Sequence, residues 1–345
     1  MKPTQYVNIE AIVPLISPKL LKEKLPITPA ISQHVLESRA VIERILKKED
    51  SRLLCVVGPC SIYDPKAALE YARKLKKLSD EVHDSIFIVM RAYFEKPRTT
   101  VGWKGYINDP HLTGKGDISE GLFLARKLLL EISEMGLPVA TEMLDPIVPQ
   151  YMADLVSWAS IGARTTESQT HREMASGLSM PVGFKNSTEG NLDVAINAMQ
   201  SACHPHDFLG INQEGQTSII KTKGNSLGHV ILRGGKTPNY DEQTIKDTLE
   251  KLSKAGFEPS IMIDCSHGNS RKKHENQESV CLEVMDLRTK GYHSIIGVMI
   301  ESNLFEGNQS ISEDLTKLHY GVSITDACIG WDTTERLIKT VFQRV

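Results

Sequence analysis

Five cationic side chains of this sequence lie at or near the ends of apolar runs, where a folded chain would bring them together. They are Arg91, Lys96, Arg164, Lys185 and Arg233. Arginine binds phosphate or carboxylate oxygens bidentately, and close cations repel one another unless anions balance them. Because few acidic residues flank these positions in RTTESQ, FKNST or LRGGK, we expect a cavity for polyanionic substrates, either one phosphate with one carboxylate or two phosphates. The alternative is that each cation forms a structural ion pair with a local carboxylate.

The segment Ile86–Tyr106 concentrates this chemistry. It begins as an apolar run and then turns basic, and its polar part includes Arg91, Lys96, Arg98, Thr99, Thr100 and Lys104. Arginine, hydroxyl and backbone N–H donors delivered into one loop suit a doubly charged phosphate. The alternative is a solvated basic loop after a core strand, and we keep that interpretation for Lys104.

A second set of side chains has the donor types of a divalent-metal site. Its members are Cys60, His267, Glu301 and Asp326, which follow the first, seventh and eighth expected strands. In a closed barrel the first and eighth strands are neighbours, so a thiolate, an imidazole and two carboxylates would meet there. This mixed set does not select one metal, because Mn²⁺, Fe²⁺, Co²⁺ and Zn²⁺ each find acceptable donors. Taken alone, Cys60 is interpreted as a small core residue and His267 as a general base.

An alternation of apolar runs and amphipathic helices positions both sets. The expected strands are residues 53–58, 86–90, 138–143, 158–163, 181–184, 229–232, 261–264 and 294–300. The expected helices are residues 65–78, 119–135, 149–156, 168–177, 192–202, 241–255, 277–290 and 333–344. Strands that are almost wholly apolar predict a parallel sheet covered on both faces. The alternation of eight such strands with helices favours an α/β (β/α)8 TIM barrel over a doubly wound sheet. Polar residues at the strand ends then face one mouth of the barrel.

Two segments fall outside this alternation. Residues 1–50 are predicted to form an N-terminal arm and helices with an oligomer or regulatory role, which leaves 51–345 as the catalytic barrel. Two β-like pieces joined by Glu214-Gly215 predict a β-hairpin inserted at about 204–226, before the sixth strand, which would serve assembly or regulation.

The composition excludes several classes of protein. At 345 residues, with 40% apolar residues and a net charge of −3, the chain has ample core and no global attraction to nucleic acid or anionic membranes. It has no apolar run long enough for a membrane span and no signal-peptide pattern, and its six cysteines form no CxxC pair, so we expect reduced thiols in the cytoplasm. Cys328 lies two residues past Asp326, which suggests the hypothesis of a Cys60–Cys328 disulfide when the metal is lost.

Eight motifs in order give the chain a family resemblance. They are GPCSIYD, KPRTTVGWKG, GARTTESQTHREMASGLS, PVGFKN, ILRGGK, DCSHGN, IESNLFEGNQ and SITDACIGW. Together they resemble the type I 3-deoxy-D-arabino-heptulosonate-7-phosphate (DAHP) synthases from about residue 40 to the C-terminus. The arm and the hairpin resemble the amino-acid-regulated subgroup. A sibling family that uses arabinose 5-phosphate carries KANR where this chain has KPRT, which argues against that alternative.

The resemblance implies a transferase that condenses phosphoenolpyruvate with erythrose 4-phosphate, the first step of the shikimate pathway. It implies that Cys60, His267, Glu301 and Asp326 bind a divalent metal, with Mn²⁺ favoured, and that the five cations bind phosphoenolpyruvate. It further implies that Arg98 and Thr99 hold the phosphate of the sugar. Lys96 is our candidate proton donor to the new alkoxide, and His267 is expected to ligate the metal and to pass a proton.

In regulated members of this family an aromatic amino acid binds between the outer face of the barrel and the inserted hairpin. The matching positions are Asp145, Pro149, Gln150, Leu178, Ser179, Phe208 and Gly210. Where phenylalanine-sensitive relatives tend to carry serine, Gly210 leaves room for a para-hydroxyl, so we expect tyrosine as the inhibitor, with phenylalanine as the alternative. Gln5 and Tyr6 replace two acidic residues often found in the arm, which puts effector contacts from the arm in doubt. A homodimer or homotetramer is expected.

Two other classes of function would leave different patterns. A metal-dependent aldolase or lyase on the same barrel needs one phosphate site, and five cations argue against it. A non-catalytic anion-binding protein would have broken metal ligands, whereas all four are present.

Overall fold

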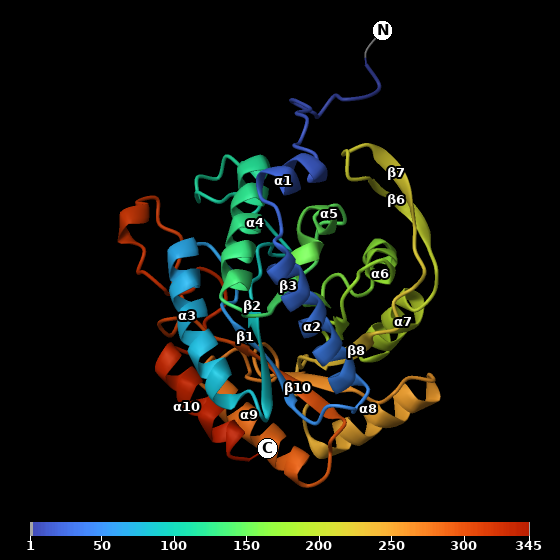
Figure 1. The fold of residues 1–345 in the computed structure, drawn as a ribbon, viewed down its shortest axis with the longest axis vertical. Helices are drawn as coiled ribbons and strands as arrows, with labels where there is room; N and C mark the ends of the chain where they lie inside the picture. Colours follow the sequence, from blue (N-terminus) through green and yellow to red (C-terminus); the bar gives the residue numbers. More distant parts are fainter. Residues whose placement is uncertain (1–2, 345) are drawn as a thin grey trace.

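The computed structural model describes residues 3–344 and has at its centre a closed parallel barrel with the strand order β1-β10-β9-β8-β5-β4-β3-β2. The barrel strands are β1 Leu53–Gly58, β2 Ile86–Arg91, β3 Val139–Glu142, β4 Trp158–Ile161, β5 Val182–Lys185, β8 Gly228–Leu232, β9 Ile261–Asp264 and β10 Ile295–Glu301. Figure 1 shows the helices arranged around these strands. The predicted (β/α)8 barrel is therefore confirmed, and the strand boundaries agree with the apolar runs to within about two residues.

The helices follow the strands as their amphipathic patterns predict. They are α3 Pro65–Val82, α4 Ile118–Glu134, α5 Pro149–Met152, α6 Gln169–Ser176, α7 Asp193–Ala202, α8 Glu242–Lys254, α9 Asn276–Thr289 and α10 Trp331–Phe342, with 3-10 turns η1 Ala153–Leu155 and η2 Leu315–Lys317. The prediction of one helix over 149–156 is wrong in detail, because α5 ends at Met152 and the chain tightens into η1. Within residues 3–344 we find no helix with the length and apolar character needed to cross a bilayer.

Side chains of alternate strand residues form two cores, because successive residues of a strand point to opposite faces. Those facing outward pack against the helices, and those facing inward fill the barrel together with Trp158. His229 is also fully buried there, and it accepts a hydrogen bond from Trp158 Nε1 at 3.3 Å. The mouth is thus backed by a packed interior rather than a pore.

Two helices precede the barrel, α1 Pro18–Lys24 and α2 Pro29–Leu46. Thr28 caps α2, since its hydroxyl accepts a hydrogen bond from Ile31 N at 3.2 Å, and Pro29 is the first helical residue. The last turns of α2 join the interior core through Ile42, Ile45 and Leu46. Helix α2 therefore closes one end of the barrel.

The inserted hairpin consists of the antiparallel strands β6 Asp207–Ile211 and β7 Thr217–Lys221, and it lies beside α6 and α7 (Figure 1). Its turn contacts the N-terminal region, where Lys19 N donates to Gln213 O at 2.8 Å and Lys22 Nζ donates to Gln213 Oε1 at 3.0 Å. The predicted hairpin before the sixth barrel strand is confirmed. The functional division of the chain at residue 50 stays a prediction.

Candidate active site

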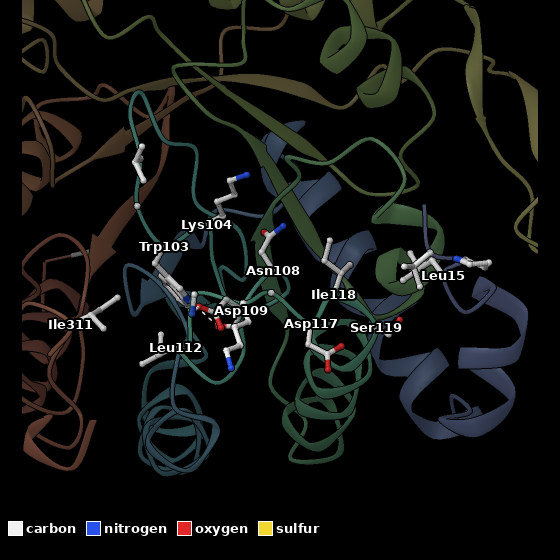
Figure 2. Close-up of a pocket in the computed structure, with 17 residues that line it drawn as sticks. Leu15, Trp103, Lys104, Asn108, Asp109, Leu112, Asp117, Ile118, Ser119 and Ile311 are labelled. Carbon is white, nitrogen blue, oxygen red and sulfur yellow. Dashed lines mark hydrogen bonds between the residues drawn. The ribbon is translucent and has the colours of Figure 1, made fainter. Parts of the chain in front are cut away.

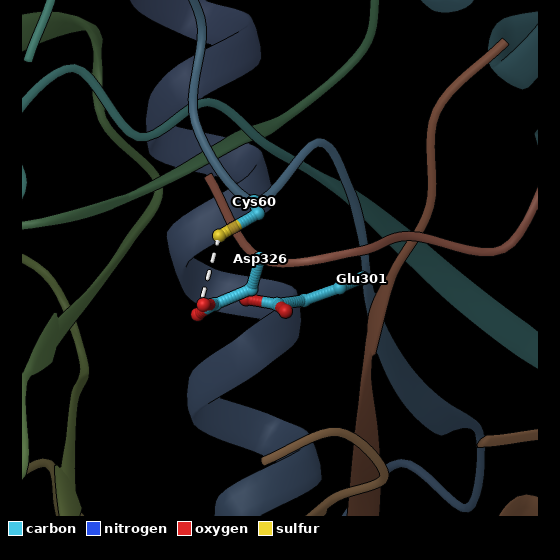
Figure 3. A group of neighbouring side chains, drawn as sticks. All are labelled: Cys60, Glu301 and Asp326. Carbon is cyan, nitrogen blue, oxygen red and sulfur yellow. Dashed lines mark hydrogen bonds between the residues drawn. The ribbon is translucent and has the colours of Figure 1, made fainter. Parts of the chain in front are cut away.

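Three of the four expected metal ligands lie together at one end of the barrel (Figure 3). Cys60 follows β1, Glu301 ends β10, and Asp326 belongs to the segment between β10 and α10. One donor atom from each lies within 4.8 Å of the others, and Cys60 Sγ is 3.7 Å from Asp326 Oδ2. Barrel closure explains the meeting, because Gly58 of β1 pairs in register with Glu301 of β10.

The fourth expected ligand, His267, lies beside this group. Its Nε2 is 3.7 Å from Glu301 Oε1 and 4.0 Å from Asp326 Oδ2. Its other ring nitrogen, Nδ1, lies 2.7 Å from Ser266 Oγ and 3.0 Å from the buried carboxylate of Asp264. These contacts fix the ring with Nε2 directed at Glu301 and Asp326. A carboxylate behind a histidine ligand is the usual arrangement around protein metals. One thiol, one imidazole and two carboxylates in this arrangement fit a divalent transition metal.

Arg91 is the buried centre of the site. At 1% exposure, its guanidinium donates to Glu301 Oε1 at 2.9 Å and to the carbonyls of Pro59 and Cys60 at 3.0 and 3.2 Å. Gly58 lets β1 lie close to the backbone of Arg91, because a Cβ there would lie 2.6 Å from the Arg91 carbonyl oxygen. The Tyr93 ring lies under the guanidinium with 3.6 Å between the arginine carbon and the ring centroid. Sequence reasoning missed Tyr93, although its position two residues after Arg91 placed it on the same side of the chain.

Lys96 joins the cationic set to the expected metal ligands. Its Nζ donates to Cys60 Sγ at 3.1 Å and to Cys60 O at 3.4 Å. Burial alone would lower the Lys96 pKa, but the neighbouring Cys60 and Glu301 raise it above its usual value, so the ammonium form is retained. Burial and the charge of Glu301 raise the pKa of the Cys60 thiol, while the ammonium of Lys96 opposes this shift.

Lys185 is also paired. Its Nζ donates to Asp264 Oδ2 at 2.8 Å, and both side chains are buried. Burial opposes ionisation of Asp264, but Lys185 and His267 hold the pKa of this carboxyl well below its usual range. The expectation that the cations lack acidic partners is therefore wrong for Lys185 and for Arg91. Their partners come from other strands, which the flanking sequence does not reveal.

Arg164 and Arg233 lie farther out, in the lining of a cavity of about 920 Å³ that also includes Thr99. Burial lowers the pKa of Arg233, and the nearby charge of Arg164 lowers it further while Asp264 opposes the shift. Among residues 3–344, neither arginine forms an ion pair within 4.0 Å, so this cavity carries the uncompensated positive charge of the mouth.

Arg98 and Thr99 lie on the loop after β2 and are exposed. Arg98 Nε donates to Trp103 O at 2.8 Å, and Trp103 Nε1 donates to Asp109 O at 2.9 Å. Trp103 and Lys104 line a separate cavity of about 970 Å³, together with Leu15 of the N-terminal arm and Ile118 of α4 (Figure 2). None of the residues expected to bind metal or substrate lines this cavity.

Glu142, at the end of β3, is a buried polar residue with no assigned role. Its Oε1 has no hydrogen-bond partner within residues 3–344.

The expected effector residues lie on three neighbouring elements. Pro149 and Gln150 begin α5, Leu178 and Ser179 follow α6, and Phe208 and Gly210 lie on β6. Gln213 of the hairpin donates to Gln150 Oε1 at 2.8 Å, and Asn225 donates to Leu178 O at 3.1 Å, which ties the hairpin to this face.

The seventh expected effector residue, Asp145, connects this face with the mouth. Its backbone N–H donates to Glu95 Oε1 at 3.2 Å, and Glu95 directly precedes Lys96. Burial, reinforced by the charge of Asp145, raises the pKa of Glu95 to about 8. Sequence reasoning missed Glu95, since nothing in its neighbours marks it as buried.

Comparisons with known proteins agree on one family. The family described as DAHP synthetase I family matches residues 27–339. The chain is 56% identical over 327 residues to the Tyr-sensitive phospho-2-dehydro-3-deoxyheptonate aldolase of Salmonella typhimurium, covering 95% of this chain and 92% of the relative. It is 53% identical over 339 residues to the Phe-sensitive enzyme of Escherichia coli, covering 98% and 97%. The solved phospho-2-dehydro-3-deoxyheptonate aldolase of Francisella tularensis superposes with a TM-score of 0.95 at 49% identity, covering 98% of each chain.

Proposed function

This chain belongs to the DAHP synthetase I family and is a DAHP synthase, and from that premise we propose that it joins phosphoenolpyruvate to erythrose 4-phosphate at the mouth of the barrel. One observation carries the proposal. A donor set for a divalent metal and a cavity with uncompensated positive charge share the same end of the barrel, with Lys96 in contact with Cys60.

The five cations are proposed to bind phosphoenolpyruvate. Within the described part of the chain, Arg164 and Arg233 form no ion pair with a carboxylate. They therefore suit the phosphate, which carries most of the negative charge of this substrate. Arg91 and Lys96 lie deeper, beside Cys60, and suit the carboxylate. Lys185, fixed by Asp264, completes the set. Because Arg91 and Lys185 are held by buried carboxylates, they are positioned before substrate arrives.

A divalent metal, with Mn²⁺ favoured, is proposed to be held by Cys60, His267, Glu301 and Asp326. When bound, it supplies a Lewis acid for the aldehyde oxygen of the sugar phosphate. Asp264 keeps the His267 ring oriented toward this position, and Arg91 holds Glu301. Arg98 and Thr99 are proposed to bind the phosphate of the sugar.

In the proposed reaction, carbon C3 of phosphoenolpyruvate attacks the aldehyde carbon and forms the new C–C bond. Lys96 Nζ donates a proton to the oxygen that becomes an alkoxide, a role for which its retained ammonium form suits it. Water adds at C2, where positive charge develops, and gives up a proton to solvent. The C2–O bond to phosphate then breaks, phosphate leaves, and C2 becomes the carbonyl carbon of the product. His267 remains a second candidate for passing a proton.

Regulation by an aromatic amino acid is proposed for the face between α5, α6 and the hairpin, with tyrosine favoured. The support is local: Gly210 carries no side chain on β6, and a Cβ there would lie 2.7 Å from Ile220 Cγ1, so any larger residue would have to displace Ile220. The hydrogen bond from Asp145 N to Glu95 offers a route to Lys96. A homodimer or homotetramer is the proposed assembly.

The test is release of inorganic phosphate from phosphoenolpyruvate, measured with and without erythrose 4-phosphate, before and after chelation and after Mn²⁺ is returned. We expect release to require the aldose, to stop on chelation and to recover with Mn²⁺. Release without the aldose would contradict the reaction, and release that persists after exhaustive chelation would contradict the metal.

A further inference from the structure

The cavity that holds Arg164 and Arg233 contains more positive charge than phosphoenolpyruvate needs. Its lining also includes Lys236, Arg271 and Lys272, against one carboxylate, Glu189. That carboxylate is already 3.2 Å from Lys236 Nζ. Clustered cations with low-dielectric walls concentrate anions, because their fields add in the cavity.

Arg271 and Lys272 come from the loop between β9 and α9, and their backbone is unusual. Both residues have left-handed φ angles, 54° and 60°, as does His267 at 55° in the same loop. A left-handed conformation is unfavourable for a non-glycine residue, because its Cβ lies too close to the following carbonyl oxygen. Three such residues within six positions therefore need support from the surrounding structure, and strained backbone of this kind clusters at binding sites.

The support is a set of short backbone contacts. Lys272 N donates to His267 O at 2.8 Å, and Arg271 N donates to Gly268 O at 3.1 Å. Gly268 lies against the β8 loop that carries Arg233, since a Cβ on Gly268 would be 2.8 Å from Gly234 C. The loop is thus fixed to the same wall as Arg233.

The two side chains themselves are uncommitted. Among residues 3–344, neither the Arg271 guanidinium nor the Lys272 ammonium lies within 4.0 Å of a carboxylate, and both are exposed where they line the cavity. The loop between β9 and α9 thus holds Arg271 and Lys272 at the cavity without acidic partners. These two cations are therefore suited to bind an anion that enters the cavity from solvent.

We propose that Arg271 and Lys272 form an outer phosphate subsite, which captures a phosphate monoester at the rim and passes it to Arg164 and Arg233. This proposal rests on the proposed function, in which both substrates carry a phosphate. Either substrate could be the one captured, since the shared chemistry is the phosphate group. Arg271 and Lys272 are positioning residues, because they act before substrate reaches the reacting atoms.

The test variant is Arg271→Asn combined with Lys272→Asn, because asparagine tolerates the left-handed conformation while the charges are removed. The matched control is Lys273→Asn, an exposed neighbour that is absent from the cavity lining. At low ionic strength we expect kcat/KM of the double variant to fall about five- to tenfold for the captured substrate, because KM rises while kcat stays the same. Measuring each substrate separately identifies which one is captured.

Two further measurements separate capture from a structural effect. At an ionic strength of about 1 M the loss should largely disappear, because exposed charges are then screened within about 3 Å. The charge-retaining double variant, Arg271→Lys with Lys272→Arg, should recover most of the lost kcat/KM. Equal behaviour of the double variant and Lys273→Asn, or a loss confined to kcat, would overturn the proposal.

A calorimetric titration with inorganic phosphate measures binding at the subsite without catalytic turnover. We expect about tenfold weaker binding to the Asn double variant and unchanged binding to Lys273→Asn. If the unmodified enzyme releases no phosphate from phosphoenolpyruvate, the proposed function fails and this titration still decides the subsite. If the enzyme is active and the titration is the same for all variants, the subsite is refuted and the function stands.

Discussion

His229 should make the fold sensitive to mild acid. Its imidazole is fully buried inside the barrel beside Trp158, and burial lowers its pKa to about 3, against a usual value of 6.5. Because the folded-state pKa is depressed, the unfolded chain binds the proton first as the pH falls. Stability is therefore intact above pH 6.5 and is lost progressively between pH 6.5 and about 3.

The magnitude follows from the two pKa values. At pH 4.5 the unfolded state lies two pH units below its own pKa while the folded site is still neutral, and each unit corresponds to ~1.36 kcal/mol, so the loss is about 3 kcal/mol. That is a large part of the 5–15 kcal/mol typical of a folded domain. Replacing His229 with Gln keeps an acceptor for Trp158 Nε1 and removes the titrating group.

The assay is urea unfolding followed by tryptophan fluorescence at pH 7.5 and pH 4.5, at one fixed protein concentration. The quantity compared is the change in unfolding free energy between the two pH values, because it cancels any direct packing cost of the substitution. We expect this change to be about 2–3 kcal/mol smaller for His229→Gln than for the unmodified chain. His293→Gln, which removes an exposed imidazole, should not alter it. The reasoning is refuted if His229→Gln and the unmodified chain lose the same stability.

Other substitutions test the mouth and the effector face. Lys96→Ala should lower kcat by at least about 10³-fold without weakening Mn²⁺ binding, and near-normal kcat in metal-loaded protein would exclude the proton-donor role. Gly210→Ser should weaken inhibition by tyrosine about tenfold relative to phenylalanine, because the Cβ of the new serine displaces Ile220. Inhibition assays with each of the three aromatic amino acids check this. An unchanged ratio of tyrosine to phenylalanine inhibition would exclude Gly210 as the determinant. Air oxidation of chelated protein should join Cys60 to Cys328, which are both free and buried, and burial and the charge of Cys60 raise the pKa of the Cys328 thiol; peptide mapping that recovers both thiols would disprove the disulfide.

The barrel and the ends of its strands were predictable from sequence because both rest on local patterns. Near-continuous apolar runs such as Leu53–Gly58 indicate parallel strands buried on both faces. Closure of the barrel between β1 and β10 then brings Cys60 beside Glu301. The donor types at those ends were readable for the same reason. Nothing beyond residue type and order was needed.

The ion pairs of the mouth were not predictable, since they join residues far apart in the chain. Arg91 meets Glu301 across 210 positions, and Lys185 meets Asp264 across 79. The burial of Glu95 and the left-handed backbone of Arg271 also depend on packing around loops rather than on the residues beside them. Composition and periodicity carry no information about such contacts.

Helix α2 limits how the chain can be shortened or extended at its beginning. Its last turns supply Ile42 and Leu46 to the barrel interior, Ser260 Oγ donates to Leu46 O at 2.9 Å, and Arg39 donates to Val156 O. A truncation that began at residue 51 would uncover apolar surface and leave Ser260 Oγ and Val156 O without these partners. Residues 3–14 are exposed and extend away from the barrel (Figure 1), whereas α1 buries Leu21 and contacts the hairpin, so affinity tags and trimmed variants belong upstream of Leu15.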